Sequence, residues 1–195
     1  MILVYDYGIG NLRSICSALE RAGGRVWAGS GPRALREADK VVFPGVGSFG
    51  AAMKALSDPA VMQALLECRE RYVRFLGICL GMQIMFDSSE ESPGAAGLGW
   101  FSGMALRLRA GTVPHMGWSR VYPAGETPIV NSPTYFYFAH SYCLMDATGV
   151  PTAGVCEHGT RFVAAIRLRD IWGVQFHPEK SGRAGARILE EFVRC

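Results

Sequence analysis

The sequence lacks long runs of any one kind of residue. No five like charges stand together among its 20 basic and 17 acidic residues, which argues against a nucleic-acid-binding surface. Its longest apolar candidate, residues 75–82, contains two glycines and falls short of the ~18 apolar residues that span a bilayer. The opening MILVYDYGIG has no basic segment, so we expect a first strand rather than a signal peptide, and a cytoplasmic protein.

Cysteine spacing of the CxxC type is also missing, so zinc and thioredoxin-type sites are not indicated. The six cysteines are Cys16, Cys68, Cys79, Cys143, Cys156 and Cys195. A core-rich chain without a recognisable signal peptide favours reduced thiols over a disulfide framework, and most of these side chains are expected to be buried. We expect no bound metal and no cofactor.

What the sequence does contain is enough apolar material for a core. Hydrophobic residues make up 49% of the 195 positions, which excludes intrinsic disorder. The length suggests a single domain, residues 1–195, that buries roughly 70% of its extended surface. The 24 glycines fall in short clusters, and this predicts many tight turns.

In the first half of the chain, short apolar runs alternate with segments of helical periodicity. We predict strands at residues 2–5, 25–28, 40–43 and 74–78, and helices that begin near residues 11, 34, 58 and 79. Asn11 is the expected cap of the first helix, and Pro59 takes the first position of the third, where its missing N–H costs little. Strands alternating with helices predict βαβ units and a parallel sheet.

From about residue 97 the pattern changes to short strands separated by Pro, Gly and Asn turns. These strands are predicted at residues 105–108, 118–122, 135–138, 153–156, 162–168 and 171–174. We expect them to extend the same sheet in an antiparallel or mixed manner, followed by a closing helix at 181–193. The predicted fold class is therefore α/β, with a parallel core and a mixed or antiparallel extension.

The segment Gly77-Ile-Cys79-Leu-Gly81 stands where a buried strand meets a helix. This is the G-x-nucleophile-x-G elbow with cysteine in place of serine, a turn so tight that only glycine fits two residues on either side. The elbow predicts a strained backbone at Cys79. It also predicts a sulfur near the N-terminus of the next helix, where the helix dipole stabilises a thiolate.

A second signal, Gln175-Phe-His177-Pro-Glu179, supplies a base and an acid. Proline disfavours the helical conformation in the residue before it, so His177 is expected to be extended. Side chains two apart in an extended segment point the same way, which lets Glu179 bind one imidazole nitrogen and leaves the other facing a thiol. With Cys79, these residues predict a Cys–His–acid triad.

The triad also needs donors for an oxyanion. The amide of Leu80 is one candidate by elbow geometry, and the loop Pro44-Gly-Val46-Gly47 after the neighbouring strand is the other. Gly45, Gly47 and Gly50 have the GxGxxG spacing of a dinucleotide site. No acidic residue follows in a second βαβ unit, so dinucleotide binding is not favoured.

These motifs resemble a known family. GICLGMQ around Cys79 and VQFHPEKS around His177 are similar to the class I (triad) glutamine amidotransferases. DYGIGNLRS (6–14), FPGVGSFG (43–50), PHMGWS (114–119) and YFAHSY (137–142) resemble one branch, the glutaminase subunits of imidazole glycerol phosphate synthase. The resemblance runs from end to end and implies a flavodoxin-like, three-layer open sheet.

The resemblance implies a role for each matching residue. Cys79 attacks the side-chain amide of L-glutamine and forms a glutamyl thioester, His177 moves the protons, and Glu179 orients His177. Residues implied to bind glutamine or its oxyanion are Val46, Gly47, Leu80, Gln83, Ser141 and Tyr142. Gln83 lies one helical turn after Cys79 and therefore on the same face.

A second subunit is implied too, because nothing in a chain of this length remains to bind an ammonia acceptor. The expected partner is a (β/α)₈-barrel cyclase, in a heterodimer that makes imidazole glycerol phosphate and AICAR from PRFAR in histidine biosynthesis. Residues implied to dock it or to line the ammonia passage are Asn11, Trp118, Tyr137 and Lys180. The PGVG loop is the expected switch. Where the family usually has PHMGWN, this chain has the shorter Ser119.

Two other readings stay open at this point. One is a related triad glutaminase that feeds another synthase, such as a sugar amidotransferase or pyridoxal phosphate synthesis, although PHMGW argues against the pyridoxal branch. The other is a protein of similar fold without amidotransferase activity, such as a chaperone-like or redox-sensing module. Such a module needs neither a His-x-Glu after a late strand nor Gln83.

Overall fold

A computed structural model describes residues 1–126 and 129–195, and its centre is a nine-stranded sheet. In spatial order the strands are β2 (Val26–Gly29), β1 (Ile2–Tyr5), β3 (Lys40–Phe43), β4 (Arg74–Ile78), β12 (Ile171–Val174), β11 (Thr160–Leu168), β10 (Thr152–His158), β7 (His115–Pro123) and β8 (Thr134–His140). From β2 to β12 neighbouring strands run parallel, and from β12 to β8 they run antiparallel. The predicted parallel core and antiparallel extension are confirmed.

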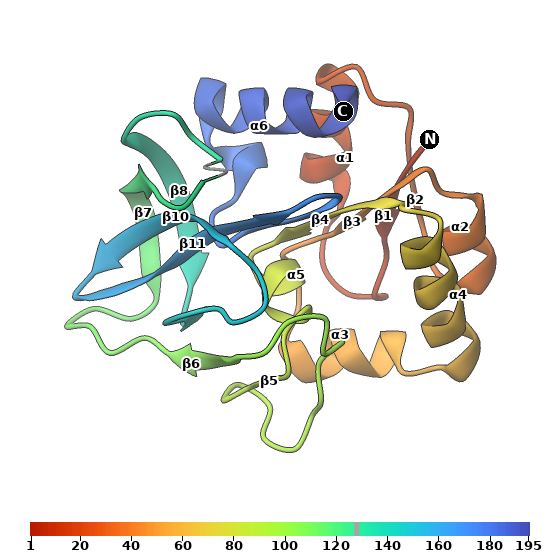
Figure 1. Ribbon diagram of the computed structural model, residues 1–195, viewed down its shortest axis with the longest axis horizontal. Coiled ribbons are helices and arrows are strands. Elements are labelled where there is room, and N and C mark those ends of the chain that lie inside the picture. Colours follow the sequence, from red (N-terminus) through yellow and green to blue (C-terminus); the bar gives the residue numbers. More distant parts are fainter. Residues whose placement is uncertain (127–128) are drawn as a thin grey trace.

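Helices cover both faces of the parallel half (Figure 1). The helices are α1 (Arg13–Arg21), α2 (Gly31–Glu37), α3 (Phe49–Leu56), α4 (Pro59–Glu70), α5 (Leu80–Gln83) and α6 (Gly182–Arg194). Strand β1 explains the layers, because Ile2 and Val4 pack in one apolar cluster with α1 and α6, whereas Leu3 and Tyr5 pack in a second cluster with α2, α3 and α4. This is the three-layer order of flavodoxin-like folds, whose ligands bind at the carboxyl ends of the strands.

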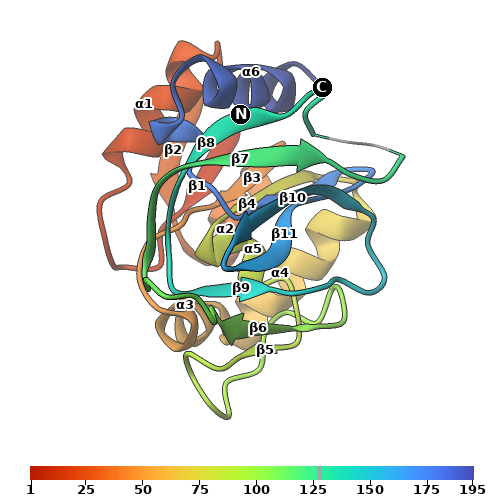
Figure 2. The same ribbon diagram turned by 90° about the vertical axis from the view of Figure 1, so that its left-hand side faces the viewer.

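Part of the second half leaves the main sheet. The strand predicted at 105–108 is β6 (Met104–Arg107), and it pairs with β5 (Ser88–Ser89) and β9 (Tyr142–Leu144) in a separate three-stranded sheet. Figure 2 shows this small sheet beside α3. The prediction that 105–108 extends the main sheet is therefore wrong. The pairing of β6 with β9 joins residues almost forty positions apart in sequence, and no local pattern encodes it.

Two helices also differ from prediction. Helix α3 was not predicted, because the groups that cap it come from a distant loop: Phe49 N–H donates to Glu91 (2.7 Å) and Gly50 N–H donates to Ser92 (2.9 Å). The helix predicted to begin near residue 79, with helical spacing as far as residue 86, ends at Gln83 as α5. A four-residue helix supplies little of a macrodipole, so the predicted dipole support for the sulfur is weak.

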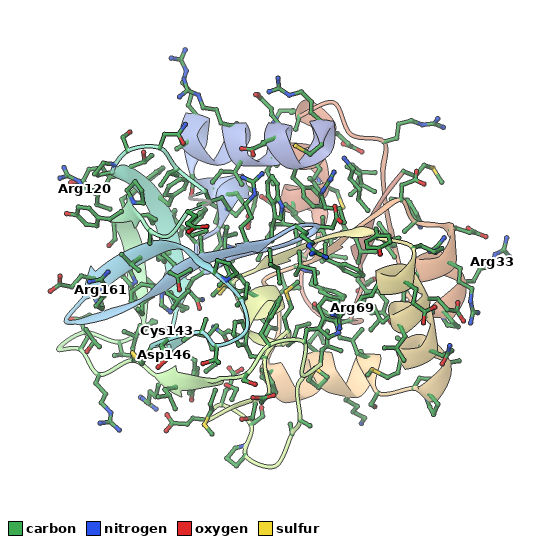
Figure 3. The ribbon with its side chains drawn as sticks, in the orientation of Figure 1. Arg33, Arg69, Arg120, Cys143, Asp146 and Arg161 are labelled. Carbon is green, nitrogen blue, oxygen red and sulfur yellow. The ribbon has the colours of Figure 1, made fainter. Side chains whose placement is uncertain are left out.

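The charged side chains are dispersed over the surface. Arg33, Arg120 and Arg161 are exposed and point away from the molecule at opposite edges (Figure 3). In the part of the chain that the structure describes, no group of three or more His, Cys, Asp or Glu is placed to hold a metal ion. Within the same residues, no helix is long and apolar enough to cross a bilayer.

Candidate active site

Cys79 occupies a sharp turn between β4 and α5. Its backbone has φ +50° and ψ −105°, a conformation that side-chain-bearing residues rarely adopt and that functional sites hold at a cost of about 1–3 kcal/mol. A Cβ at Gly77 would lie 2.4 Å from Gly81 O, and one at Gly81 would lie 2.0 Å from Phe43 O. The predicted elbow is confirmed in geometry, including its need for glycine on both sides.

His177 follows β12, the strand next to β4, and its backbone is extended (φ −99°, ψ 98°) as predicted. Glu179 lies in the short 3₁₀ helix η1 (Pro178–Lys180), so the expectation that it continues the extended segment is wrong. The turn still brings the carboxylate to the ring: His177 Nδ1 lies 2.8 Å from Glu179 Oε1, and both side chains are more than nine-tenths buried. Glu179 therefore fixes the ring and leaves the other nitrogen free.

The backbone around His177 is tied to the last strand of the sheet. His177 N–H donates to Tyr137 O in β8 at 2.8 Å. Ser181 Oγ accepts from Tyr137 N–H at 2.9 Å and donates to His177 O at 2.6 Å. Three hydrogen bonds thus set the height of the imidazole above the sheet.

Gly45 lies against both Cys79 and His177. A Cβ built on Gly45 would lie 2.9 Å from Cys79 Cβ and 2.9 Å from His177 Cε1. Burial lowers the pKa of His177, but the hydrogen bonds and negative charges of Cys79 and Glu179 together outweigh it and raise that pKa to about 10. The surroundings of the ring therefore favour its protonated form, the form it has once it has taken the thiol proton.

A cavity of about 280 Å³ opens over Cys79, close to the lower limit for small-molecule sites. Five of the six residues predicted to bind glutamine line it, namely Gly47, Leu80, Gln83, Ser141 and Tyr142. Val46 is not among the lining residues, and its side chain packs over Gly10. Lining residues that the sequence reasoning did not assign to the substrate are Gly45, Glu91, Pro114, Met116, Ala139 and His140.

Gln83 is held in one orientation by its neighbours. Its Nε2 donates to Tyr142 O at 2.8 Å and to Gln175 Oε1 at 3.1 Å. A carbonyl oxygen only accepts, so the nitrogen of the Gln83 amide must face Tyr142. Gln175 was missed as a site residue, although its position two residues before His177 places both side chains on the same side of the chain.

A buried histidine pair lies behind Tyr142. His140 Nδ1 is 3.0 Å from Tyr142 O and therefore carries the hydrogen, since the carbonyl oxygen only accepts. His140 Nε2 then accepts from His115 Nδ1 (3.1 Å), and His115 Nε2 accepts from Ser119 Oγ (2.8 Å). Burial, chiefly, lowers the pKa of His140 to about 3 and that of His115 to about 4. Ser119 is thus the first donor of a buried hydrogen-bond chain that runs through His115 and His140 to Tyr142 O.

Three of the four predicted docking residues form one surface. Trp118 in β7 is 54% exposed and meets the ring of Tyr137 on β8 edge-on, with centroids 6.1 Å apart. Lys180 Nζ lies 5.9 Å from the centre of the Tyr137 ring. Asn11 is exposed before α1, and its side chain accepts from Arg13 N–H (2.9 Å), while Leu12 rather than Asn11 is the cap residue.

Residues 3–195 match the family described as glutamine amidotransferase class-I. The chain belongs to this family. The resemblance inferred from the triad motifs is confirmed, and so is the fold class. The family match argues against the alternative of a chaperone-like or redox-sensing module, because it covers almost the whole of this chain.

Curated relatives of this amidotransferase cover it from end to end. It is 42% identical to the imidazole glycerol phosphate synthase subunit HisH of Thermococcus kodakarensis over 202 aligned residues, with both chains fully covered. It is 41% identical to the HisH subunit of Bacillus subtilis, with 100% of this chain and 96% of the relative covered.

Solved structures share the fold of this amidotransferase at much lower identity. One described as a glutamine amidotransferase has a TM-score of 0.78 and 16% identity, with both chains fully covered. The PurLQS structure from Thermotoga maritima has a TM-score of 0.77 and 18% identity, covering 99% of this chain and 97% of the other. At these identities, the likeness concerns the fold alone.

Proposed function

We propose that this amidotransferase is the glutaminase subunit of an imidazole glycerol phosphate synthase, acting in histidine biosynthesis as a single domain over residues 1–195. Its full-length relatives, at about two-fifths identity, carry that name. The observation that carries the proposal is the grouping of Cys79, His177 and Glu179, with Cys79 lining a cavity of about 280 Å³. The substrate is L-glutamine, and its products are glutamate and ammonia.

In the first half of the reaction, Cys79 passes its proton to the free ring nitrogen of His177, and the sulfur attacks the side-chain carbonyl carbon of glutamine. The amide oxygen gains negative charge, and N–H groups of Leu80 and of the loop at Val46 and Gly47 are its proposed donors. When the carbon–nitrogen bond breaks, His177 gives its proton to the leaving nitrogen. Ammonia departs and a glutamyl thioester remains.

In the second half, water attacks the thioester carbon while His177 takes a proton from it. The carbon–sulfur bond breaks, glutamate leaves and the thiol is restored. Glu179 stabilises the imidazolium in both halves, because its Oε1 accepts from Nδ1 throughout. Gln83, Ser141 and Tyr142 hold the backbone end of glutamine in the cavity.

The proposed partner is a (β/α)₈-barrel cyclase that consumes the ammonia. Free ammonia is mostly protonated in neutral water and is then no nucleophile. A subunit docked over the triad would receive the ammonia before it is protonated. Trp118, Tyr137 and Lys180, which share one surface, and Asn11 at the start of α1 are the proposed contacts. Gly47, which has φ +90° and lines the cavity, is the residue at which the PGVG loop switches.

The test is glutamate release by wild type and by Cys79→Ser, alone and with the barrel cyclase and PRFAR. We expect stimulation of the wild type by the partner and a loss of at least ~10³-fold in Cys79→Ser, with its binding to the barrel retained. Cys195→Ser, at an exposed cysteine, is the matched control and should keep wild-type activity. Hydrolysis by Cys79→Ser would refute the triad, and full activity without the barrel would refute the switch.

A further inference from the structure

One side chain that contacts the nucleophile, Gln175, takes no part in the mechanism proposed for glutamine hydrolysis. The amide nitrogen of Gln175, Nε2, lies 3.4 Å from Cys79 Sγ. Ala139 O, 3.9 Å from the same sulfur, accepts from a thiol and repels a thiolate. Gln175 is therefore a neutral donor aimed at the reacting atom.

The orientation of the Gln175 amide is determined by its surroundings. Tyr142 O requires the Gln83 nitrogen to face it, and the second N–H of that nitrogen points to Gln175 Oε1. With its oxygen committed to Gln83, the amide of Gln175 can present only N–H to Cys79 Sγ. A flipped amide would set two N–H groups against each other at one end and an oxygen against the sulfur at the other.

The position of Gln175 in the fold shows that this contact belongs to the nucleophile rather than to the substrate. Its side chain is fully buried and is not part of the cavity lining. Phe176 points to the other side of the chain, where it stacks on Phe136 with ring centroids 4.0 Å apart. Gln175 and His177 both follow the end of β12, and both side chains lie on the Cys79 side of the chain.

We propose that Gln175 is a further catalytic residue: its amide donates to Cys79 Sγ in the thiolate state and holds the sulfur in position for attack. Gln175 forms and breaks no covalent bond, and the thiol proton still goes to His177. The hydrogen bond is strongest while the sulfur is negative and weakens as that charge passes to the amide oxygen of glutamine. As a statement about glutamine turnover, this rests on the proposed function.

The test is Gln175→Met, which keeps the volume and removes the donor. A hydrogen bond to a charged group contributes about 1.5–3 kcal/mol, and part of it is already lost in the transition state, so kcat in the complex with the barrel cyclase should fall roughly 10-fold and by no more than about 100-fold. KM should change less than about threefold, because Gln175 does not line the cavity and Gln83 keeps its hydrogen bond to Tyr142 O when it loses the one to Gln175. Gln63→Met, the same change at an exposed position in α4, is the matched control and should keep wild-type values.

A second readout needs no glutamine. The rate of iodoacetamide alkylation at Cys79, followed on its peptide by mass spectrometry, should reach its half-maximum about one to two pH units higher in Gln175→Met than in wild type. Gln175→Glu keeps the oxygen that accepts from Gln83 but sets a second oxygen against the sulfur, and should move the midpoint up at least as far. This variant serves if Gln175→Met does not fold.

The outcomes separate the two proposals. If wild type hydrolyses no glutamine with its partner, the proposed function fails, while the alkylation midpoint still tests the contact between Gln175 and Cys79. A midpoint unchanged in a folded Gln175 variant overturns the role of Gln175. So does a lower kcat that is matched by an equal rise in KM.

Discussion

A methyl group placed at Gly45 tests the triad geometry most directly. Gly45→Ala adds one carbon against both the Cys79 and the His177 side chains, and the backbone there does not have the positive φ that would itself exclude alanine. The new Cβ would lie 2.9 Å from Cys79 Cβ and from His177 Cε1, and 3.0 Å from Ile78 O. The substitution therefore acts on the distance between nucleophile and base without removing either.

The size of the effect follows from these contacts. Carbon atoms pack at about 3.5–4.0 Å, so each side chain must retreat by roughly 0.6–1 Å. A misplacement of about 1 Å at a reacting group costs on the order of 10²-fold in rate. Overpacking of this kind destabilises by about 1–3 kcal/mol, which leaves a chain of this size folded.

The assay is glutamate release in the complex with the barrel cyclase, with urea unfolding on the same samples. We expect kcat to fall about 100-fold in Gly45→Ala and the urea midpoint to fall modestly. Gly111→Ala is the matched control, because its Cβ would meet nothing within 4 Å and its φ is ordinary. Activity within twofold of wild type in Gly45→Ala would refute the arrangement of Cys79 and His177 described above.

Two further predictions concern stability. The lowered pKa values of His115 (about 4) and His140 (about 3), which arise chiefly from burial, mean that the unfolded chain takes up protons first as pH falls below about 6.5. Their contribution to stability is thus present above about pH 6.5 and should be reduced by roughly 2 kcal/mol per ring at pH 5. The raised pKa of His177 makes its own contribution to stability larger at low pH, which would mask the effect of His115 and His140. The measurement is therefore urea unfolding of His177→Gln at pH 8 and pH 5. Equal free energies of unfolding at the two pH values would contradict the lowered pKa values of His115 and His140. Gly81→Ala should destabilise by about 3 kcal/mol or more, because its Cβ would lie 2.0 Å from the backbone oxygen of Phe43, which has no room to retreat. A wild-type urea midpoint in this variant would show that the elbow tolerates a side chain.

Much of the fold and of the triad could be predicted because the determinants are local. The apolar run 74–78 followed by Gly77-Ile-Cys79-Leu-Gly81 encodes a buried strand and its elbow within eight residues. His177 and Glu179 are two residues apart, so their pairing depends on one short turn. The site then forms because β4 and β12 are neighbours, and the parallel order follows from the alternation of strands and helices.

What could not be predicted depends on partners far away in sequence. Helix α3 begins where Glu91 and Ser92 supply its caps from 42 residues away. The role proposed for Gln175 is visible only once Gln83, 92 residues earlier, is seen to orient its amide. Such contacts are properties of the assembled fold, and a pattern confined to a short window does not contain them.

The hydrogen bond between His177 N–H and Tyr137 O has a consequence for how this protein loses activity in solution. Strand β8 is the last strand of its sheet, and sheet edges fray at a lower free energy than the core opens. When β8 frays, the imidazole loses its anchor while β1, β3 and β4 stay packed. We therefore expect inactivation of the isolated subunit to precede its denaturation, so that a preparation judged intact by its secondary structure can already contain catalytically inactive molecules.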